Sequence, residues 1–506
     1  MTLKPTRRLV LLLVLALAPV VARAGEPVSF EITFSKKLRT EPFTGRVIIY
    51  MSDKLSGQPR LQHGWTSRQP VFGKNVKDWK PESKLTITEA DGFPYSLAEL
   101  PAKKYAVQAV MHTNLDEPHS GKAPGNLYSK SEEFDLDAAD FDGVITLRIN
   151  KRVAEKTNDS GMPRSKIVEL KSEMLSKFYG RDVYQRAVVL LPREYESEPD
   201  RKFPAIYVIH GFGGDHFQSA MMASIYGKPN VPVIRIGLDA SCALGHHVFA
   251  DSANNGPRGT ALVEELIPYL EKEFRLISDP RARLLTGHSS GGWASLWLQV
   301  AYPDYFGGVW STSPDPVTFH DFCGPDFYEA GANAYYKDDD SQWPTMRENG
   351  AVKQYLKEFV EMEETIGPGG QIQSFDAVFS PQGDDGMPLP AFDRKTGKVN
   401  PDVIKAWKKY DIVEKLKKEW PTLKDKLEGK ITVIMGGEDT FYLEGAARIM
   451  QKEMKKLGST ARIIIVPGRD HGSIMGSKPF RNMYPEMCEH FKKCGFAPTS
   501  QPADED

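Results

Sequence analysis

Hydrophobic and polar residues alternate with a period of two from residue 27 to about residue 152. The stretches at 28–34, 46–50, 84–88 and 144–149 show this alternation, and Pro, Gly, Asp and Asn gather between them. Such alternation predicts strands that are buried on one face. No long stretch with helical spacing interrupts the run, so residues 25–152 are predicted to form a small all-β sandwich domain.

A different pattern begins near residue 169, where predicted strands alternate with predicted helices. Residues 153–168 are polar and predict a linker between the two patterns. Several of the later strands are hydrophobic on consecutive residues, as expected when helices cover both faces of a sheet. The pattern predicts a doubly wound, mostly parallel sheet over 169–497. The predicted strands are 186–191, 205–209, 231–238, 283–286, 308–311, 430–435 and 462–466.

Two amphipathic helices are predicted in this region, at 260–274 and 446–457. Pro268 should kink the first, and Gly458 should end the second. Residues 324–429 form a long insertion with helical pieces at 352–362 and 403–418, which we expect to act as a lid or a pocket wall. The acidic tail 498–506 is expected to be disordered.

The N-terminal residues 1–24 resemble a signal peptide. Lys4, Arg7 and Arg8 precede a hydrophobic run from residue 9 to residue 21, and Ala22-Arg23-Ala24 follows it. A run of this length is too short to span a bilayer as a helix, which argues against the alternative of a membrane anchor. We therefore expect a cleaved signal peptide, a periplasmic or secreted protein and no stable membrane insertion.

Composition restricts the function further. The chain has 506 residues and a formal net charge of -2, without a long basic block, so no nucleic-acid partner is expected. The four cysteines lack metal-like spacing. A bridge between Cys488 and Cys494 would require the chain to turn between them, because a straight helix holds their Cα atoms too far apart.

The strongest chemical signal is Gly287-His288-Ser289-Ser290-Gly291, which fits the pattern G-x-S-x-G. A predicted strand precedes it and a predicted helix follows it. In that context the motif places a nucleophilic serine on a sharp turn, and the flanking glycines remove side chains that would clash there. Only Ser289 has glycines at both required positions, so we predict Ser289 as the nucleophile, with an ordinary glycine-rich turn as the alternative.

A nucleophilic serine needs a base, and the base needs an orienting acid. Asp439 follows the strand at 430–435, and His471 follows the strand at 462–466, so both leave carboxyl ends of strands. We predict His471 as the general base and Asp439 as the acid. Glu438 is the alternative acid.

A glycine-rich loop, Gly211-Phe212-Gly213-Gly214, follows the strand at 205–209. Such a loop directs backbone N–H groups at the oxyanion that develops during acyl transfer. We predict the N–H groups of Phe212 and Ser290 as the oxyanion hole.

Residues 203–214, 287–292 and the loops of Asp439 and His471 together resemble the esterase D and enterochelin esterase-like family of the α/β-hydrolase superfamily. Asp251-Ser252-Ala253-Asn254-Asn255-Gly256-Pro257 adds to the resemblance, which covers about two-thirds of the chain. It implies the α/β-hydrolase fold and ester chemistry without a cofactor. Feruloyl and acetyl-xylan esterases, enterochelin esterases, S-formylglutathione hydrolases and mycolyltransferases share the pattern, so it implies the chemistry better than the substrate.

Substrate contacts are predicted for Trp293, Asp315 and Tyr442, with core packing or turn capping as the alternatives. Phe212, Trp310 and Phe441 are further aromatic candidates for a pocket wall. Asp338-Asp339-Asp340 lacks the alternating spacing of a Ca²⁺ loop, so no metal site is predicted.

The leading hypothesis is an exported serine esterase that acts on a small-molecule or carbohydrate ester. Acyl transfer to a sugar or lipid acceptor would use the same residues. A prolyl-oligopeptidase-like peptidase would carry a longer front domain. A non-catalytic sugar- or siderophore-binding protein is the alternative of another class, and the intact Ser, Asp and His argue against it.

Overall fold

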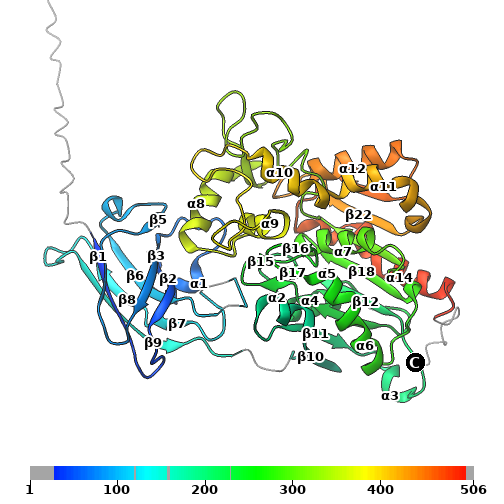
Figure 1. Ribbon diagram of the computed structural model, residues 1–506, viewed down its shortest axis with the longest axis horizontal. Coiled ribbons are helices and arrows are strands. Elements are labelled where there is room, and N and C mark those ends of the chain that lie inside the picture. Colours follow the sequence, from blue (N-terminus) through cyan, green and yellow to red (C-terminus); the bar gives the residue numbers. More distant parts are fainter. Residues whose placement is uncertain (1–27, 115, 119–120, 156–159, 228, 497–506) are drawn as a thin grey trace, which may run out of the picture.

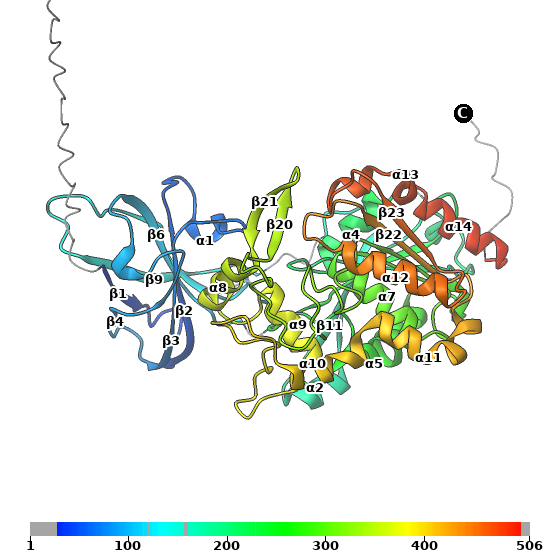
Figure 2. The ribbon, with the colours of Figure 1, turned by 90° about the horizontal axis from the view of Figure 1, so that it is seen from above.

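The computed structural model describes residues 28–496 except 115, 119–120, 156–159 and 228. The predicted signal peptide and the predicted disordered tail therefore lie outside the described residues. Figures 1 and 2 show a strand-rich N-terminal part beside a larger α/β part, with helices α8 (Leu356–Ile366) and α9 (Gln371–Phe379) between them. These two helices belong to the predicted insertion.

The N-terminal part is built from one nine-stranded sheet, in the order β4-β1-β9-β7-β6-β2-β3-β5 with β8 paired to β6. Its buried residues alternate as the sequence predicts, for example Phe30, Ile32 and Phe34 in β1. Residues of β1 and β9 share one hydrophobic core with residues of β2, β3 and β6. The short strand β7 hydrogen-bonds to β6 on one side and to β9 on the other, and so joins the two halves of this strand-rich part. The strands are β1 (Ser29–Phe34), β2 (Phe43–Ser52), β3 (Val71–Trp79), β4 (Leu85–Ile87), β5 (Asp91–Phe93), β6 (Lys104–Met111), β7 (Leu127–Ser129), β8 (Glu132–Asp135) and β9 (Val144–Arg152).

The α/β part contains an eight-stranded sheet in the order β10-β11-β13-β12-β18-β19-β22-β23. The six strands from β13 to β23 in this order are parallel, and only β11 runs antiparallel to its two neighbours, β10 and β13, which confirms the predicted mostly parallel sheet. Residues 165–168, expected in the linker, instead begin edge strand β10. The strands are β10 (Ser165–Lys171), β11 (Tyr184–Leu190), β12 (Ala205–Ile209), β13 (Ile234–Leu238), β18 (Arg283–His288), β19 (Gly308–Thr312), β22 (Ile431–Gly436) and β23 (Arg462–Val466).

Helices cover both faces of this sheet. Helices α4 (His216–Ile225), α13 (Lys478–Arg481) and α14 (Met483–Lys493) pack on one face, against residues such as Ile206 and Val208 of β12. Helices α6 (Ile267–Glu273), α7 (Ser290–Ala301), α11 (Ile412–Leu427) and α12 (Glu444–Lys456) pack on the other face, against Tyr207 and Ile209. Alternate residues of one strand thus enter two cores, as a doubly wound sheet requires.

Two predicted helices have local differences. The helix predicted at 260–274 is split into α5 (Arg258–Ala261), a π-helical turn (Leu262–Leu266) and α6, because Pro268 has no N–H to donate to the preceding turn. The helix at 446–457 ends before Gly458, whose φ is 66°. The short elements are α1 (Pro59–Gln62), α2 (Glu173–Tyr179), α3 (Glu194–Ser197), β14 (Ser241–Cys242), β15 (Gly245–His246), β16 (Asp251–Ser252) and β17 (Gly256–Pro257).

The chain between β19 and β22 forms a hairpin and then helices. Its elements are β20 (Pro344–Glu348), β21 (Ala351–Tyr355), α8, α9, α10 (Pro401–Trp407) and α11. The helix predicted at 352–362 was wrong over its first four residues, which form β21. The helix predicted at 403–418 is interrupted by Asp411, whose side chain caps α11 by accepting from the N–H of Glu414.

Helix α8 joins the two parts of the molecule. It packs on β3 and β5, and Arg46 of β2 donates hydrogen bonds to the carbonyls of Thr365 and Ile366 at its last turn. Arg46 is 8% exposed and also forms a 2.8 Å ion pair with Asp91. A cation at the C-terminus of a helix is favourable because the carbonyls there have no intrahelical partner.

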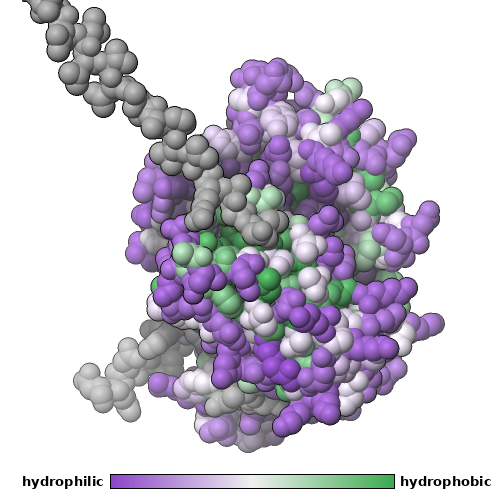
Figure 3. All heavy atoms as spheres, turned by 90° about the vertical axis from the view of Figure 1, so that its left-hand side faces the viewer, coloured by the Kyte–Doolittle hydropathy of each residue, from purple (hydrophilic) through white to green (hydrophobic). Residues whose placement is uncertain are grey.

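On the face of the molecule that the N-terminal part presents, hydrophilic side chains predominate and hydrophobic ones gather across the middle (Figure 3). Cys488 lies within α14 and Cys494 at its end, and both are free because the chain does not turn between them.

Within the described residues, no helix is long and apolar enough to cross a membrane.

Candidate active site

Ser289 lies on a sharp turn between β18 and α7. Its φ of 60° and ψ of -126° lie in a region that non-glycine residues rarely adopt. The flanking glycines allow this turn to pack closely: a Cβ at Gly287 would lie 2.2 Å from the carbonyl oxygen of Gly291, and one at Gly291 would lie 2.1 Å from that of Ile209. The motif therefore forms the strained strand-to-helix turn that the sequence predicts.

His471 and Asp439 are brought together from the loops after β23 and β22. Nδ1 of His471 lies 2.8 Å from Oδ2 of Asp439, which is fully buried. The other carboxylate oxygen of Asp439 accepts a hydrogen bond from the N–H of Phe441 at 2.9 Å. Asp439 rather than Glu438 thus orients the imidazole. Asp470, next to His471, is exposed and caps the following turn.

The imidazole of His471 lies beside the nucleophile segment. Its ring centroid is 4.5 Å from that of His288, the residue before Ser289. Burial opposes protonation, but the attraction of Asp439 and its hydrogen bond outweigh burial, so the pKa of His471 lies above its usual value. None of the described residues forms a hydrogen bond with the Ser289 hydroxyl. Hydrogen bonds of this kind are often long in unliganded enzymes and shorten when substrate binds.

The glycine-rich loop after β12 lies against Ser289. A Cβ at Gly211 would be 3.3 Å from the Cβ of Ser289, and Gly213 adopts a φ of 79°. Ser290 is the first residue of α7, where a backbone N–H has no acceptor within the helix. The loop and the start of the helix therefore border Ser289 from two sides.

Two buried histidines hold this loop. Nε2 of His210 accepts a hydrogen bond from the N–H of Ala240 at 2.9 Å, which leaves Nδ1 to donate to the carbonyl of Gly211 at 2.7 Å. His246 donates to the carbonyl of His210 at 3.0 Å. Burial holds the pKa of His246 well below its usual value, so this ring is neutral. No motif in the sequence indicated that these two histidines support the loop.

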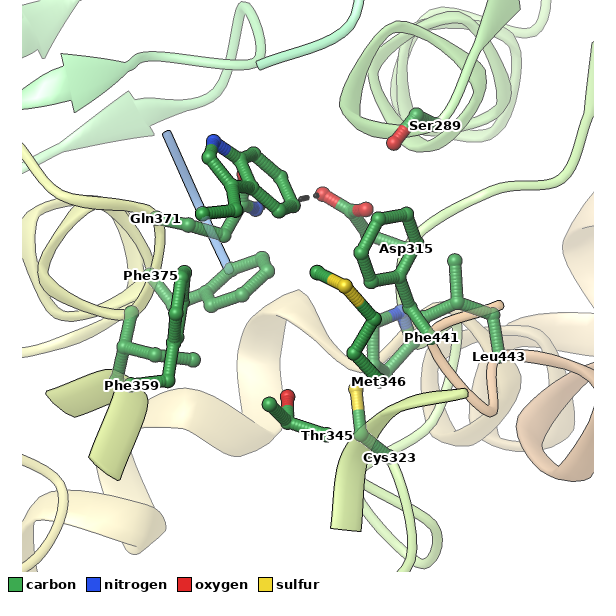
Figure 4. Close-up of a pocket in the computed structure, with 13 residues that line it drawn as sticks. Ser289, Asp315, Cys323, Thr345, Met346, Phe359, Gln371, Phe375, Phe441 and Leu443 are labelled. Carbon is green, nitrogen blue, oxygen red and sulfur yellow. Dashed lines mark hydrogen bonds between the residues drawn. The ribbon is translucent and has the colours of Figure 1, made fainter. Parts of the chain in front are cut away.

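A pocket of about 450 Å³ opens beside Ser289 and is mostly hydrophobic (Figure 4). Asp315 and Gln371 point toward one another at one side of it, near Ser289. The predicted contact residue Asp315 thus reaches the site. The described residues that line the pocket are Trp65, Ser289, Asp315, Pro316, Cys323, Thr345, Met346, Phe359, Gln371, Ile372, Phe375, Phe441 and Leu443.

Trp65 belongs to the N-terminal part, in the connection between β2 and β3. Its ring contacts those of Phe212, Phe359 and Phe441, with centroid distances of 5.8, 5.6 and 5.1 Å. Its backbone carbonyl accepts a 2.8 Å hydrogen bond from Gln354. The N-terminal part therefore supplies one wall of the pocket, which the sequence analysis missed because Trp65 carries no motif.

Two predicted contact residues do not line the pocket. Trp293 is 1% exposed and stacks on Trp297 at 5.4 Å, so it belongs to the core. Tyr442 lies under the guanidinium of Arg347, 4.4 Å from the ring centroid. Phe441, its neighbour, lines the pocket and also packs edge-on against His471 at 4.8 Å.

A second and larger cavity, of about 1100 Å³, lies between the N-terminal part and the insertion. It shares Trp65 and Phe359 with the first pocket. Arg60 and Lys122 supply positive charge to its wall, and Phe212 joins it to the glycine-rich loop. Among the described residues, no group of three or more His, Cys, Asp or Glu side chains is arranged to hold a metal ion.

The chain is similar to known proteins over part of its length. The chain is 30% identical over 141 residues to Esterase MT1326 of Mycobacterium tuberculosis, covering 26% of this chain and 30% of that protein. It is 25% identical over 141 residues to the uncharacterized protein YbbA of Bacillus subtilis, covering 26% and 56%. The match thus spans about a third to a half of the length of these relatives.

Among solved structures, a ferulic acid esterase aligns with a TM-score of 0.41 and 15% identity, covering 65% of this chain and 99% of that one. An S-formylglutathione hydrolase from Agrobacterium tumefaciens aligns with a TM-score of 0.39 and 13% identity, covering 64% and 95%. Residues 184–471, which include the glycine-rich loop, Ser289, Asp439 and His471, match the family described as Putative esterase. The chain belongs to that family.

Proposed function

We propose that the protein hydrolyses a carboxylic ester through a covalent acyl-enzyme on Ser289. One observation carries the proposal: Ser289 is held in a strained turn, the ring of its neighbour His288 lies 4.5 Å from that of His471, and Nδ1 of His471 is paired with a buried carboxylate. That arrangement activates a hydroxyl that is otherwise a weak nucleophile.

In the first half of the proposed reaction, Ser289 Oγ attacks the ester carbonyl and His471 Nε2 takes its proton. The backbone N–H groups of Phe212 and Ser290 donate to the oxyanion of the tetrahedral intermediate. Loss of one such donor typically costs about 2.7–4 kcal/mol of transition-state stabilisation. As the intermediate collapses, the bond to the alcohol oxygen breaks and His471 returns the proton to that oxygen.

In the second half, His471 removes a proton from water, which attacks the acyl-enzyme. Collapse of the second intermediate releases the acid and returns the proton to Ser289. Asp439 stabilises the imidazolium in both halves. If an alcohol replaced water in this step, the same residues would perform acyl transfer. Product analysis with and without an added alcohol separates these two outcomes.

The test is to treat the protein with a short-chain p-nitrophenyl ester and, separately, with a phosphonate that labels active serines. We expect ester hydrolysis and one covalent adduct by mass spectrometry, with both lost in Ser289→Ala. Ser290→Ala, which keeps its backbone N–H, should still form the adduct. An adduct that persists in Ser289→Ala would exclude Ser289 as the nucleophile. A folded wild type without hydrolysis or adduct would favour a non-catalytic binding protein.

Export is a separate part of the proposal. It is supported by Lys4, Arg7, Arg8 and the hydrophobic run that ends before Ala22-Arg23-Ala24. The experiment is to express the full chain in a bacterial host, fractionate the cells and determine the N-terminus of the product. A mature protein that begins near residue 25 outside the cytoplasm is the expected result, and an uncleaved cytoplasmic protein would contradict it.

A further inference from the structure

Asp315 is the only charged side chain among the described residues that line the pocket beside Ser289. It is 5% exposed, and no Lys or Arg of the described chain lies within ion-pair distance of it. Its Oδ2 atom accepts hydrogen bonds from the Ser290 hydroxyl at 2.6 Å and from Gln371 Nε2 at 3.4 Å. No described residue donates to its Oδ1 atom.

Gln371 presents a second acceptor that has no donor. Its side chain is 8% exposed, and its Oε1 atom has no hydrogen-bond partner among the described residues. The residue is held firmly, because the carboxyl group of Glu363 accepts from the backbone N–H groups of Gln371 and Ile372. Gly370 leaves no room for adjustment, since a Cβ there would lie 2.3 Å from Cδ of Glu363.

Buried acceptors without donors are unfavourable, and so is a buried carboxylate that is attracted by His471 but pairs with no Lys or Arg of the described chain. Burial raises the pKa of Asp315 to about 6, so the group is ionised above that pH although it lies in a hydrophobic pocket. Aromatic and aliphatic side chains make up most of the remaining wall. A ligand group that donates hydrogen bonds would offset the unfavourable burial, whereas a purely hydrocarbon ligand would add to it.

The position of His471 indicates which half of the ester the pocket holds. His471 must protonate the departing alcohol oxygen, and His471 is not among the residues that line this pocket. The portion of the ester inside the pocket is therefore the portion that stays attached to Ser289. On the basis of the proposed function, we propose that the preferred acyl group carries a hydroxyl or ammonium group that donates to Asp315 and Gln371.

The test compares methyl esters of equal size by pH-stat titration. Three sets of butyrate esters are used, with the substituent at C2, C3 or C4. Within each set the esters differ only in whether that substituent is a methyl, a hydroxyl or an ammonium group. The assays are run at pH 7, which lies above the pKa of about 6 for Asp315, so that this carboxyl is ionised while amines at C3 and C4 stay protonated. We expect wild-type kcat/KM to favour a hydroxyl or ammonium ester over its methyl isostere by at least about tenfold at one position, which corresponds to about 1.4 kcal/mol.

Two variants of Asp315 show whether the acyl group donates through a hydroxyl or an ammonium group. Asp315→Leu should lose or reverse the preference, because it removes both charge and acceptors. Asp315→Asn should lose a preference for ammonium but keep much of one for hydroxyl. Asp321→Asn is the matched control: burial also raises the pKa of this carboxyl to about 6, yet Asp321 does not line the pocket, so the preference should persist.

The outcomes are distinguishable from failure of the proposed function. If all esters are hydrolysed by Ser289 but the wild type shows no preference for a donor at any position, the inference is wrong and the proposed function stands. A preference that survives in both Asp315 variants also overturns it. If Asp315→Leu does not fold, the ratio measured in Asp315→Asn decides. A merely structural role for Asp315 would lower all rates together and leave the ratios unchanged.

Discussion

Nδ1 of His471 lies 2.8 Å from Oδ2 of Asp439, a carboxylate with no exposed surface. The two residues come from loops after neighbouring parallel strands, β22 and β23, so the sheet itself sets their separation. A buried carboxylate in this position fixes the tautomer of the ring and favours its protonated form.

Replacement of this carboxylate should reduce catalysis while leaving binding in place. For Asp439→Asn we expect kcat to fall by about 10⁴-fold, because the amide cannot stabilise the imidazolium or enforce the correct tautomer. Glu438→Gln is the matched control and should remain within about twofold of wild type. Steady-state kinetics on both variants provide the measurement. Equal losses in the two variants would remove the special role of Asp439.

The pH dependence of activity should report the environment of His471. Catalysis requires a neutral imidazole, and the pKa of His471 lies above its usual 6.5 because Asp439 outweighs burial. Asp315 and Asp470 add attraction, and burial keeps His288 neutral by holding its pKa well below its usual value. We therefore expect kcat/KM to fall on the acid side with a midpoint above pH 6.5. In Asp439→Asn the midpoint should move to lower pH, and an unchanged midpoint would assign the acid limb to another group.

Removal of the indole at position 65 should weaken substrate binding. Trp65→Ala takes away one wall of the pocket, and loss of about 1.5 kcal/mol of hydrophobic contact corresponds to roughly a tenfold rise in KM. The chemistry should change less, since Trp65 contacts none of the catalytic atoms. Arg68→Ala alters the same connection at an exposed ion pair with Glu358 and should have little effect. Kinetics that fail to distinguish the two variants would show that Trp65 does not contact substrate.

Arg46 should contribute to the stability of the whole chain. Arg46→Ala leaves buried carbonyls of Thr365 and Ile366 without their donor, which should lower the free energy of unfolding by about 1–3 kcal/mol. Arg148→Ala breaks an exposed ion pair with Glu82 and should cost much less. Thermal denaturation followed by circular dichroism compares the two. A Tm for Arg46→Ala no lower than that for Arg148→Ala would contradict the role of Arg46.

The parts of the site that the sequence predicted share one property: each depends on local backbone geometry. Ser289 is flanked by glycines that the turn requires, and His471 and Asp439 end strands whose hydrophobic runs are easily recognised. The edge strand β10 was missed because its polar residues resemble a linker. Trp293 was predicted to contact substrate because it is close to Ser289 in sequence. In the structure its side chain points from α7 into the hydrophobic core.

Trp65, Phe359 and Gln371 could not be predicted to belong together. They come from a connection in the N-terminal part and from two helices of the insertion, and no periodicity or spacing links them. Only the packing of α8 on β3 and β5 brings them to one place. Sequence patterns therefore predicted the reactive groups, whereas long-range packing determines the surroundings of the substrate.

Because Trp65 forms one wall of the pocket, substrate specificity depends on where the N-terminal part lies. Because Trp65 is carried by a body with its own core, a small rotation at the joint around Arg46 would reshape the recess beside Ser289 without altering any residue of the α/β part. Substitutions at that joint, far from the reacting atoms, can thus retune which acids fit. An isolated α/β fragment would keep the reactive groups but accept a different range of esters.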